Sequence, residues 1–494
     1  MDESPSSADD GHPSPKDRQG GSGLRRGAGL LLASQWVRFI AQLTTTLLLA
    51  RILVPDDFGT AALVTMVVGF GYLLGESGLS AAAIQAADLT DRQASNLLWT
   101  NVAVGGVLAG IAYGLSGPLG SFSGDAHVTE SLRVACWALP LQAAYSQIAA
   151  QRTRALQFSR IAIAEVTAQM AGLALAITLA LSGFGHWSLV LQLVAVAAVQ
   201  LLCIVLGALP WRLYLPSRAP MGRLYRFGFD TLGLQALTYG SNNMDTFAGS
   251  RFWATADLGI YSRAIQLFRQ PLQLLLTPLT KVALPILSRR QADVTWLNHV
   301  LVRAQRLIAS TLGIVFAVLL ISAEEIIYLA LGPGWDPVVQ PFQILVIGGI
   351  FQCAGYVYYW AFLVRAKTGV QLRASILSRS LQIVLICVAA PFGPVWVAAA
   401  VSAGLLLHWI LLSTLPMRRT GLDVPALVRA LLLPMAIHVA LCSAGILVHR
   451  HLIRFLASDF LIILGVTLFY CTAFAIVATL SGTLRQDFRS IFAR

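Results

Sequence analysis

Apolar stretches of roughly 20 residues follow one another along this chain, separated by short polar segments. A helix of that length spans the ~30 Å hydrocarbon core of a bilayer. The pattern predicts about 14 transmembrane helices, at 28–53, 58–84, 93–117, 128–150, 160–182, 186–209, 226–250, 258–285, 300–323, 338–364, 371–392, 394–415, 428–449 and 459–481. We therefore expect an all-α polytopic membrane protein, because backbone polar groups in lipid must bond within their own helix.

A short motif, Arg-x5-Asp-[Phe/Leu]-Gly, occurs twice in the chain, 200 residues apart. Its fixed positions are Arg51, Asp57 and Gly59, then Arg251, Asp257 and Gly259. The interval holds six predicted helices, an even number, so both copies cross the membrane in the same direction. This predicts two six-helix bundles related by a parallel pseudo-two-fold repeat, plus two C-terminal helices. We interpret the motif itself as structural: each aspartate caps the next helix and each glycine allows a tight turn.

The repeat and the polar segments predict five regions. They are a disordered cytoplasmic tail (1–26), an N-terminal six-helix bundle (27–209), a cytoplasmic linker (210–225), a C-terminal six-helix bundle (226–415), and two additional transmembrane helices with a short cytoplasmic tail (416–494). The first region is rich in Ser, Pro, Asp and Gly and has almost no large apolar residue, which is typical of a disordered segment.

Basic residues fall in alternate loops. The loops at 116–127, 183–187, 324–336 and 391–394 contain no Lys or Arg, whereas most of the others are rich in Arg. Because Lys and Arg accumulate in cytoplasmic loops, the alternation predicts that both termini lie in the cytoplasm. Only 12% of residues are charged, and the net charge of +12 is spread over short loops, so nucleic-acid binding is not expected.

Two predicted helices carry a polar stripe at corresponding positions. The first stripe is Gln35, Arg38, Gln42 and Thr45, and the second is Gln235, Thr238, Asn242 and Asp245. Polar groups facing lipid are costly, so the stripes should face a hydrophilic cavity between the bundles. The alternative is hydrogen bonding between helices without any contact to substrate.

Further charges within the spans give the stripes a chemical interpretation. An arginine suits an anionic substrate group, and a buried carboxylate suits proton or sodium coupling. The predicted substrate-binding residues are Gln35, Arg38, Gln42, Asn242, Asn243, Arg263, Arg269 and Arg379. The predicted ion-coupling residues are Glu76, Glu165, Asp230 and Asp245. Alternatively, Arg38 forms a static ion pair with Glu76 or Glu165.

The chain carries no sequence signature of an enzyme. It has no P-loop, no nucleophile elbow and no metal motif, and its six cysteines lie in apolar stretches without the spacing of ligands. We therefore expect neither catalysis nor a cofactor, and expect transport to draw on an ion gradient, the substrate gradient or a partner protein.

Several segments resemble a known family. The stretches Ala50–Val64 and Gly75–Gln85 are similar to the opening signature of bacterial polysaccharide exporters, and Leu258–Leu267 and Leu284–Arg289 are similar to the second-half signature. These exporters are oligosaccharide flippases of the multidrug/oligosaccharidyl-lipid/polysaccharide (MOP) superfamily, and the colanic-acid and succinoglycan exporter type is the most similar. The resemblance extends from about Gly27 to Leu480.

The resemblance implies a V-shaped pair of bundles in the bacterial inner membrane. It also implies a substrate, an undecaprenyl-diphosphate-linked oligosaccharide that crosses the lipid bilayer by alternating access for exopolysaccharide or surface polysaccharide biosynthesis. Arginines would hold the diphosphate, and a polysaccharide polymerase and chain-length regulator are the expected partners. Two alternatives stay open: an ion-coupled antiporter of drugs or metabolites from the same superfamily, and a non-transporting scaffold in a polysaccharide assembly complex.

Overall fold

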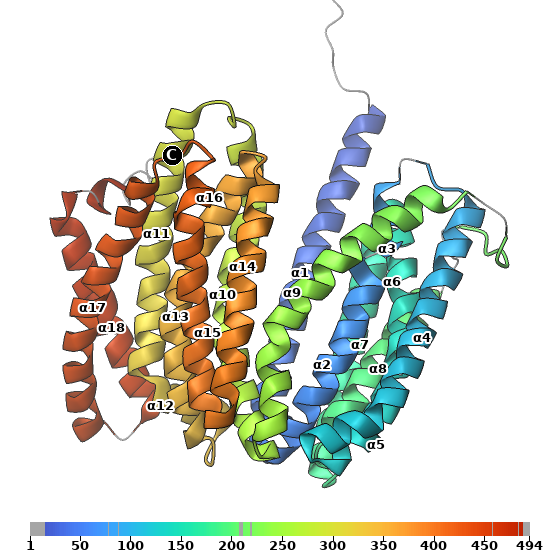
Figure 1. The fold of residues 1–494 in the computed structure, drawn as a ribbon, viewed down its shortest axis with the longest axis horizontal. Helices are drawn as coiled ribbons and strands as arrows, with labels where there is room; N and C mark the ends of the chain where they lie inside the picture. The colour runs from blue at the N-terminus through green and yellow to red at the C-terminus, as the bar shows by residue number, and fades with distance from the viewer. Residues whose placement is uncertain are drawn as a thin grey trace, which may run out of the picture. The chain divides into compact units, whose positions relative to one another are not determined.

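The computed structural model describes residues 15–77, 79–86, 88–206, 211–217, 220–456, 458–482 and 484–487. Every regular element within these residues is helical (Figure 1). The α-helices of the first half are α1 (Pro15–Ile52), α2 (Pro55–Ser77), α3 (Leu79–Gln85), α4 (Asp91–Ser123), α5 (Ala126–Ala135), α6 (Ala138–Arg154), α7 (Phe158–Leu181) and α8 (Trp187–Val205). Those of the second half are α9 (Gly222–Phe252), α10 (Thr255–Ser288), α11 (Val294–Ile321), α12 (Ala323–Leu331), α13 (Val339–Val364), α14 (Thr368–Ala389), α15 (Pro394–Ser413), α16 (Leu415–Arg418), α17 (Val424–Phe455) and α18 (Asp459–Leu480). Two 3-10 turns, Asp336–Val338 and Ala390–Phe392, precede α13 and α15.

The predicted apolar ranges fall on these helices. The range 58–84 lies on α2 and α3, the range 128–150 lies on α5 and α6, and most described residues of each other range lie on one long helix. Within the described residues, ten helices are long and apolar enough to cross a membrane. The chain is therefore an all-α polytopic membrane protein, and the total of about 14 spans stays a prediction.

Side chains at helix starts explain some of the boundaries. Asp293 and Asp423 precede α11 and α17, and their carboxylates accept hydrogen bonds from the backbone N–H groups of Trp296 and Ala426. Each carboxylate thus satisfies one of the N–H groups that a helix leaves unbonded in its first turn.

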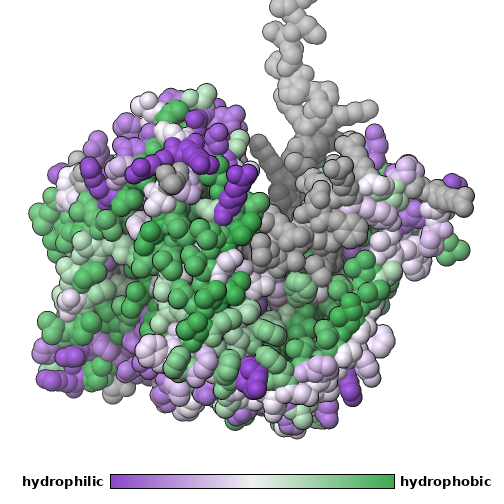
Figure 2. Space-filling view, viewed as in Figure 1, coloured by the Kyte–Doolittle hydropathy of each residue, from purple (hydrophilic) through white to green (hydrophobic). Residues whose placement is uncertain are grey.

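The helix surfaces are those expected in lipid. On α17 and α18 large apolar side chains are exposed, including Val439 (67%), Leu447 (60%) and Ile476 (61%). Figure 2 shows apolar side chains along the middle of the helices around α11 to α18 and polar ones gathered at their ends. Exposed apolar surface of this extent is stable in a bilayer rather than in water.

The chain divides into two compact units. The first consists of the chain up to Thr46 with residues 67–116 and 132–236, and the second of residues 47–66, 117–131 and 237 onward. In the first unit, α8 contacts both α6 and α7. In the second, α13 contacts α10, α11 and α15, and α17 and α18 lie beside α11 (Figure 1). The second unit therefore contains the start of α2 and the α4–α5 turn from the N-terminal half of the sequence.

The two motif glycines meet in this second unit. A Cβ atom on Gly59 of α2 would lie 1.9 Å from the carbonyl oxygen of Thr255, and one on Gly259 of α10 would lie 1.9 Å from that of Pro55. The two contacts are equivalent, because Thr255 and Pro55 are 200 residues apart and so occupy the same position in the two copies of the motif region. Such reciprocity is characteristic of a two-fold contact. Glycine is required at both positions because the backbones of α2 and α10 approach too closely for any side chain.

The motif arginines also connect the two copies. The Nη2 atom of Arg51 donates to the carbonyl of Leu329, at 2.5 Å, and the guanidinium of Arg251 lies over the ring of Phe122, 5.9 Å from its centroid. Each arginine thus contacts an arginine-free segment of the other half. We name the joint formed by Arg51, Gly59, Arg251 and Gly259 with these partners the crossed joint.

The expected role of the motif aspartates needs correction. Asp57 is the third residue of α2 and not its N-cap, since the helix begins at Pro55. Its Oδ2 atom accepts a hydrogen bond from the N–H of Val54, at 3.2 Å, which is one half of a capping box. Asp257 has the same place in the first turn of α10, where a negative charge favours the helix dipole.

A second structural echo lies where α6 and α13 end. Both helices close with Schellman hydrogen bonds: Gln157 N donates to Arg152 O, and Lys367 N donates to Phe362 O, each at 2.9 Å. The residues just before them, Leu156 (φ 55°) and Ala366 (φ 50°), adopt the left-handed conformation that usually requires glycine. The same strained turn in both halves supports the duplication inferred from sequence.

Most of the predicted linker is fixed to the first unit. Asn96 of α4 forms two hydrogen bonds with the backbone of Ser217, at 2.6 and 2.9 Å. Trp99 donates to the carbonyl of Tyr214, and Trp211 is buried against α4 with its indole N–H bonded to Ser95. The final residues of the predicted linker belong to α9, which begins at Gly222.

Candidate substrate site

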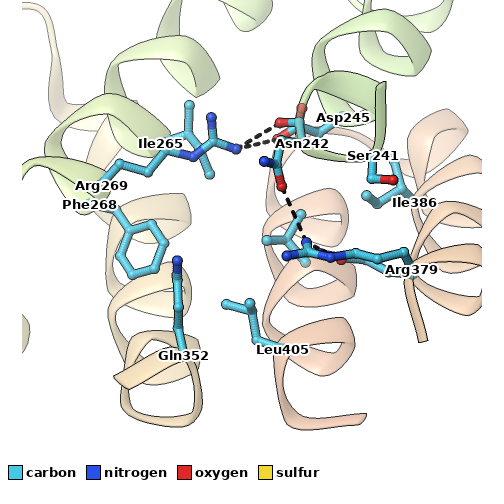
Figure 3. Close-up of a pocket in the computed structure, with 12 residues that line it drawn as sticks. Ser241, Asn242, Asp245, Ile265, Phe268, Arg269, Gln352, Arg379, Ile386 and Leu405 are labelled. Carbon is cyan, nitrogen blue, oxygen red and sulfur yellow. Dashed lines mark hydrogen bonds and ion pairs between the residues drawn. The ribbon is translucent and has the colours of Figure 1, made fainter. Parts of the chain in front are cut away.

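A polar pocket lies among α9, α10, α13, α14 and α15 of the second unit (Figure 3). Its polar lining consists of Ser241, Asn242, Asp245, Arg269, Gln352, Arg379 and Gln382. The pocket volume is about 50 Å³, which is room for a few water molecules. A ligand the size of a diphosphate would therefore bind at the open face of the pocket, where the Arg269 side chain is 36% exposed.

Arg379 lies in this pocket without a carboxylate partner. Its Nη1 atom donates to Asn242 Oδ1 at 3.2 Å and to Gln382 Oε1 at 3.1 Å. No ion pair of Arg379 with an acidic side chain occurs in the described part of the chain. Neutral amide oxygens thus orient the guanidinium and leave its positive charge uncompensated.

Asp245 and Arg269 face each other but do not form a close pair. Their nearest atoms, Arg269 Nη2 and Asp245 Oδ2, are 4.0 Å apart. The carboxylate accepts instead from Thr246 N at 2.8 Å and from the Tyr261 hydroxyl at 2.9 Å, while Arg269 Nη2 donates to the Asn242 carbonyl at 2.8 Å. With two guanidinium groups and one carboxylate, the ionised side chains that line the pocket carry a net positive charge.

The first unit contains the other charged pair. Arg38 of α1 forms an ion pair with Glu165 of α7, at 2.7 Å between Nη1 and Oε2, and the Tyr145 hydroxyl donates to the same carboxylate. The pairing of Arg38 with Glu165, one of the two structural alternatives, therefore occurs in this conformation. Gln35 and Gln42 are exposed on the same helix.

Two predicted residues of the second unit lie away from the pocket lining. The Arg263 guanidinium lies 4.4 Å from the centroid of the Phe58 ring, and its buried Nε has no hydrogen-bond partner among the described residues. The side-chain amide of Asn243 donates to the carbonyl of Tyr239 on its own helix. The side chains of Glu76 and Asp230, and of Gln235 and Thr238 in the second stripe, lie outside the described residues.

The structure therefore gathers four predicted residues, Asn242, Asp245, Arg269 and Arg379, into one pocket. Sequence reasoning missed Gln352, Gln382 and Tyr261. Gln382 was detectable, because it lies three residues after Arg379 and thus on the same helix face. Tyr261 gave no signal, since its bond to Asp245 depends on how α9 packs against α10.

Comparison with known proteins identifies the family. The family described as "Polysaccharide biosynthesis protein" matches residues 48–340 of this chain. The chain is 26% identical over 270 residues to the succinoglycan biosynthesis transport protein ExoT of Rhizobium meliloti, covering 55% of each protein. It is 23% identical over 319 residues to the lipopolysaccharide biosynthesis protein WzxC of Escherichia coli, covering 62% of this chain and 63% of the relative. The matched segments thus span less than two thirds of either relative.

Solved structures share the fold at low identity. The lipid II flippase MurJ in an inward closed conformation superposes with a TM-score of 0.75 at 13% identity, covering 94% of this chain and 100% of that one. An inward-facing multidrug resistance MATE transporter of the MOP superfamily gives a TM-score of 0.62 at 14% identity, covering 79% and 96%. Because the family match spans more than half of the chain, this protein belongs to the family described as polysaccharide biosynthesis proteins.

Proposed function

We propose that this protein moves an undecaprenyl-diphosphate-linked oligosaccharide repeat unit across the bacterial inner membrane, for exopolysaccharide or surface polysaccharide biosynthesis. The observation that carries the proposal is the pair of guanidinium groups, Arg269 and Arg379, whose charge exceeds that of the single lining carboxylate, Asp245. Guanidinium groups bind phosphate oxygens with two parallel hydrogen bonds, so a diphosphate suits this pocket.

The relatives support this substrate class. Their names concern succinoglycan, lipopolysaccharide and teichuronic acid, three different polymers, while one protein of similar fold is a flippase of lipid II. The sugars differ between these polymers, so the shared element is expected in the lipid-linked carrier. That expectation agrees with a pocket whose charged groups suit a diphosphate.

The predicted architecture supplies the route. Two parallel six-helix bundles, with about 14 transmembrane helices in total and both termini in the cytoplasm, would alternately open toward each side of the membrane. The headgroup would meet Arg269, Arg379 and Asn242 in the second half, and Arg38, Gln35 and Gln42 in the first. A polysaccharide polymerase and chain-length regulator would then receive the repeat unit.

The Arg38–Glu165 pair suggests how an ion gradient drives this cycle. The guanidinium is engaged by the carboxylate at 2.7 Å, so a phosphate must displace Glu165 to reach it. A coupling cation that binds Glu165 would compete with Arg38 for the carboxylate and release the guanidinium. Substrate binding would in this way be coupled to ion uptake, with Asp245, Glu76 and Asp230 as further candidate coupling groups.

The test is the location of the lipid-linked repeat unit in cells. In a deletion strain we expect repeat units to accumulate on the cytoplasmic leaflet and polymer export to fall to background, with restoration by the wild-type gene. Unchanged export in the deletion strain would overturn the flippase proposal and leave a scaffold role. Normal export together with lost resistance to organic cations would instead favour the antiporter. This alternative is retained because the chain shares its fold with a MATE multidrug transporter.

A further inference from the structure

Tyr261 is a fully buried tyrosine on α10 whose hydroxyl bonds to a charged residue of the pocket. Its exposure is 0%, and its Oη donates to Asp245 Oδ2 at 2.9 Å. The ring packs edge-on against Trp253, with 5.4 Å between ring centroids, and the Trp253 indole donates to the Ala390 carbonyl at 2.7 Å. The tyrosine hydroxyl thus has a fixed position beside the carboxylate.

Each oxygen of Asp245 already has a hydrogen-bond donor. Oδ1 accepts from Thr246 N and Oδ2 accepts from Tyr261, while the nearest cationic atom, Arg269 Nη2, is 4.0 Å away. That separation is too long for a hydrogen bond, and Arg269 Nη2 donates to the Asn242 carbonyl instead. Arg269 is therefore attracted electrostatically to Asp245 but does not form a hydrogen bond with it.

Loss of the tyrosine hydroxyl would change this balance. Asp245 is only 3% exposed, so an oxygen left without a donor could not be satisfied by bulk water. Among the described residues Arg269 is the cationic donor that approaches Asp245, at 4.0 Å, and its side chain is 36% exposed. It would move onto the carboxylate and form a charge-assisted pair, which would engage up to two of its five N–H groups and offset its positive charge.

We propose that Tyr261 is a positioning residue that occupies Asp245 and thereby keeps Arg269 available for a phosphate group. This inference rests on the proposed function of the pocket as a diphosphate site. It assigns no contact with substrate to Tyr261 itself. Its effect on binding passes entirely through the charge of Asp245, which makes it separable from a packing role.

The experiment measures inorganic pyrophosphate binding to the full-length protein in lipid nanodiscs by calorimetry. Tyr261→Phe should weaken binding about tenfold, as expected when one charge-assisted contact is lost. In an Asp245→Asn background Tyr261→Phe should cause no further loss of affinity, because a neutral amide no longer attracts Arg269. The matched control is Tyr358→Phe, which removes a buried hydroxyl that accepts from Ser413 outside the pocket, and it should bind as wild type.

The outcomes separate the two proposals. Equal affinity of wild type and Tyr261→Phe, or a double variant weaker than Asp245→Asn alone, overturns the role of Tyr261 and leaves the anion site standing. Absence of pyrophosphate binding to the wild type overturns the anion site and the inference with it. Should Tyr261→Phe not fold alone, the Asp245→Asn variant and the double variant are compared: equal affinity supports the inference, and a double variant about tenfold weaker contradicts it.

Discussion

At the scale of single residues, the arginines of the two units have different hydrogen-bond and ion-pair partners. In the first unit Arg38 pairs with Glu165 at 2.7 Å, whereas in the second Arg269 lies 4.0 Å from Asp245 and Arg379 donates to the amide oxygens of Asn242 and Gln382. The second half therefore presents available positive charge, and the first presents charge that must be released. The division suits a cycle in which an anion binds first to the second half.

Arg379→Ala should lower polymer export about tenfold or more while the protein still inserts, because phosphate would lose a bidentate donor. Arg379→Lys should be intermediate, since an ammonium group keeps the charge but not the planar fork. The matched control is Arg373→Ala, an exposed arginine six residues earlier on α14. Polymer yield against immunoblotted protein measures the effect, and equal losses from both alanine variants would contradict the assignment.

Exchange of the two residues of the Arg38–Glu165 pair distinguishes a structural ion pair from one that must open during transport. The Arg38 side chain is 41% exposed, so the pair should contribute only about 0–1 kcal/mol to stability. The exchanged variant, Arg38→Glu with Glu165→Arg, should keep the ion pair and the protein level but not export, because the arginine now lies on another helix. Restored export would return the pair to a structural role.

The sequence could predict part of this site and not all of it. Asn242 and Asp245 follow from the helical spacing of the second stripe, and Arg379 and Arg269 from charge within an apolar span. The hydrogen bond between Tyr261 and Asp245 could not be predicted, because it depends on the rotation of α9 against α10. For the same reason the spacing could not separate Arg263, which stacks on Phe58, from Arg269, which lines the pocket.

At the scale of elements, hydropathy located the long helices but not their ends. The predicted span 428–449 stops short of α17, which continues to Phe455 and carries His449, 2.6 Å from Glu325 of α12. Helix α12 has nine residues and lies in a predicted loop, where no apolar stretch of membrane length exists. Short helices and polar helix ends depend on tertiary partners, so periodicity alone does not predict them.

Gly59→Ala and Gly259→Ala should each destabilise the protein, by about 1–3 kcal/mol, because the added Cβ would lie 1.9 Å from a backbone oxygen and force α2 and α10 apart. The two losses should be similar, since the contacts are reciprocal. Gly106→Ala on α4 has no atom within 4 Å of the added Cβ and should be neutral or stabilising. Thermal unfolding in detergent measures all three, and an unchanged midpoint for either joint variant would argue against a tight crossing.

At the scale of the whole molecule, the family assignment and the charge pattern together make a prediction about orientation. The charge pattern predicts that the linker lies on the cytoplasmic side and the arginine-free loops on the opposite side. The described linker is fixed to α4, so its side of the membrane should not vary between conformations. Orientation is thus accessible to a static labelling measurement.

In a cysteine-free background, a cysteine at Ser217 should react with a membrane-impermeant maleimide only after the cytoplasmic face is opened. A cysteine at Gly334 should react in intact spheroplasts. The reverse pattern would invert the proposed direction of transport, and labelling of both positions from one side would mean that the predicted number of spans between them is wrong.

The crossed joint also limits how the sequences of the two halves can evolve. Each motif glycine is fixed by the backbone of the other copy, so a mutation in one half must be tolerated by the path of the other half. The two copies therefore cannot diverge independently at this point, although each evolves as its own stretch of sequence. The polar stripes differ at corresponding positions: one carries Arg38 where the other carries Thr238. If the predicted duplication is right, contact between the copies should keep the joint alike while the stripe residues, which we propose face the substrate, diverge.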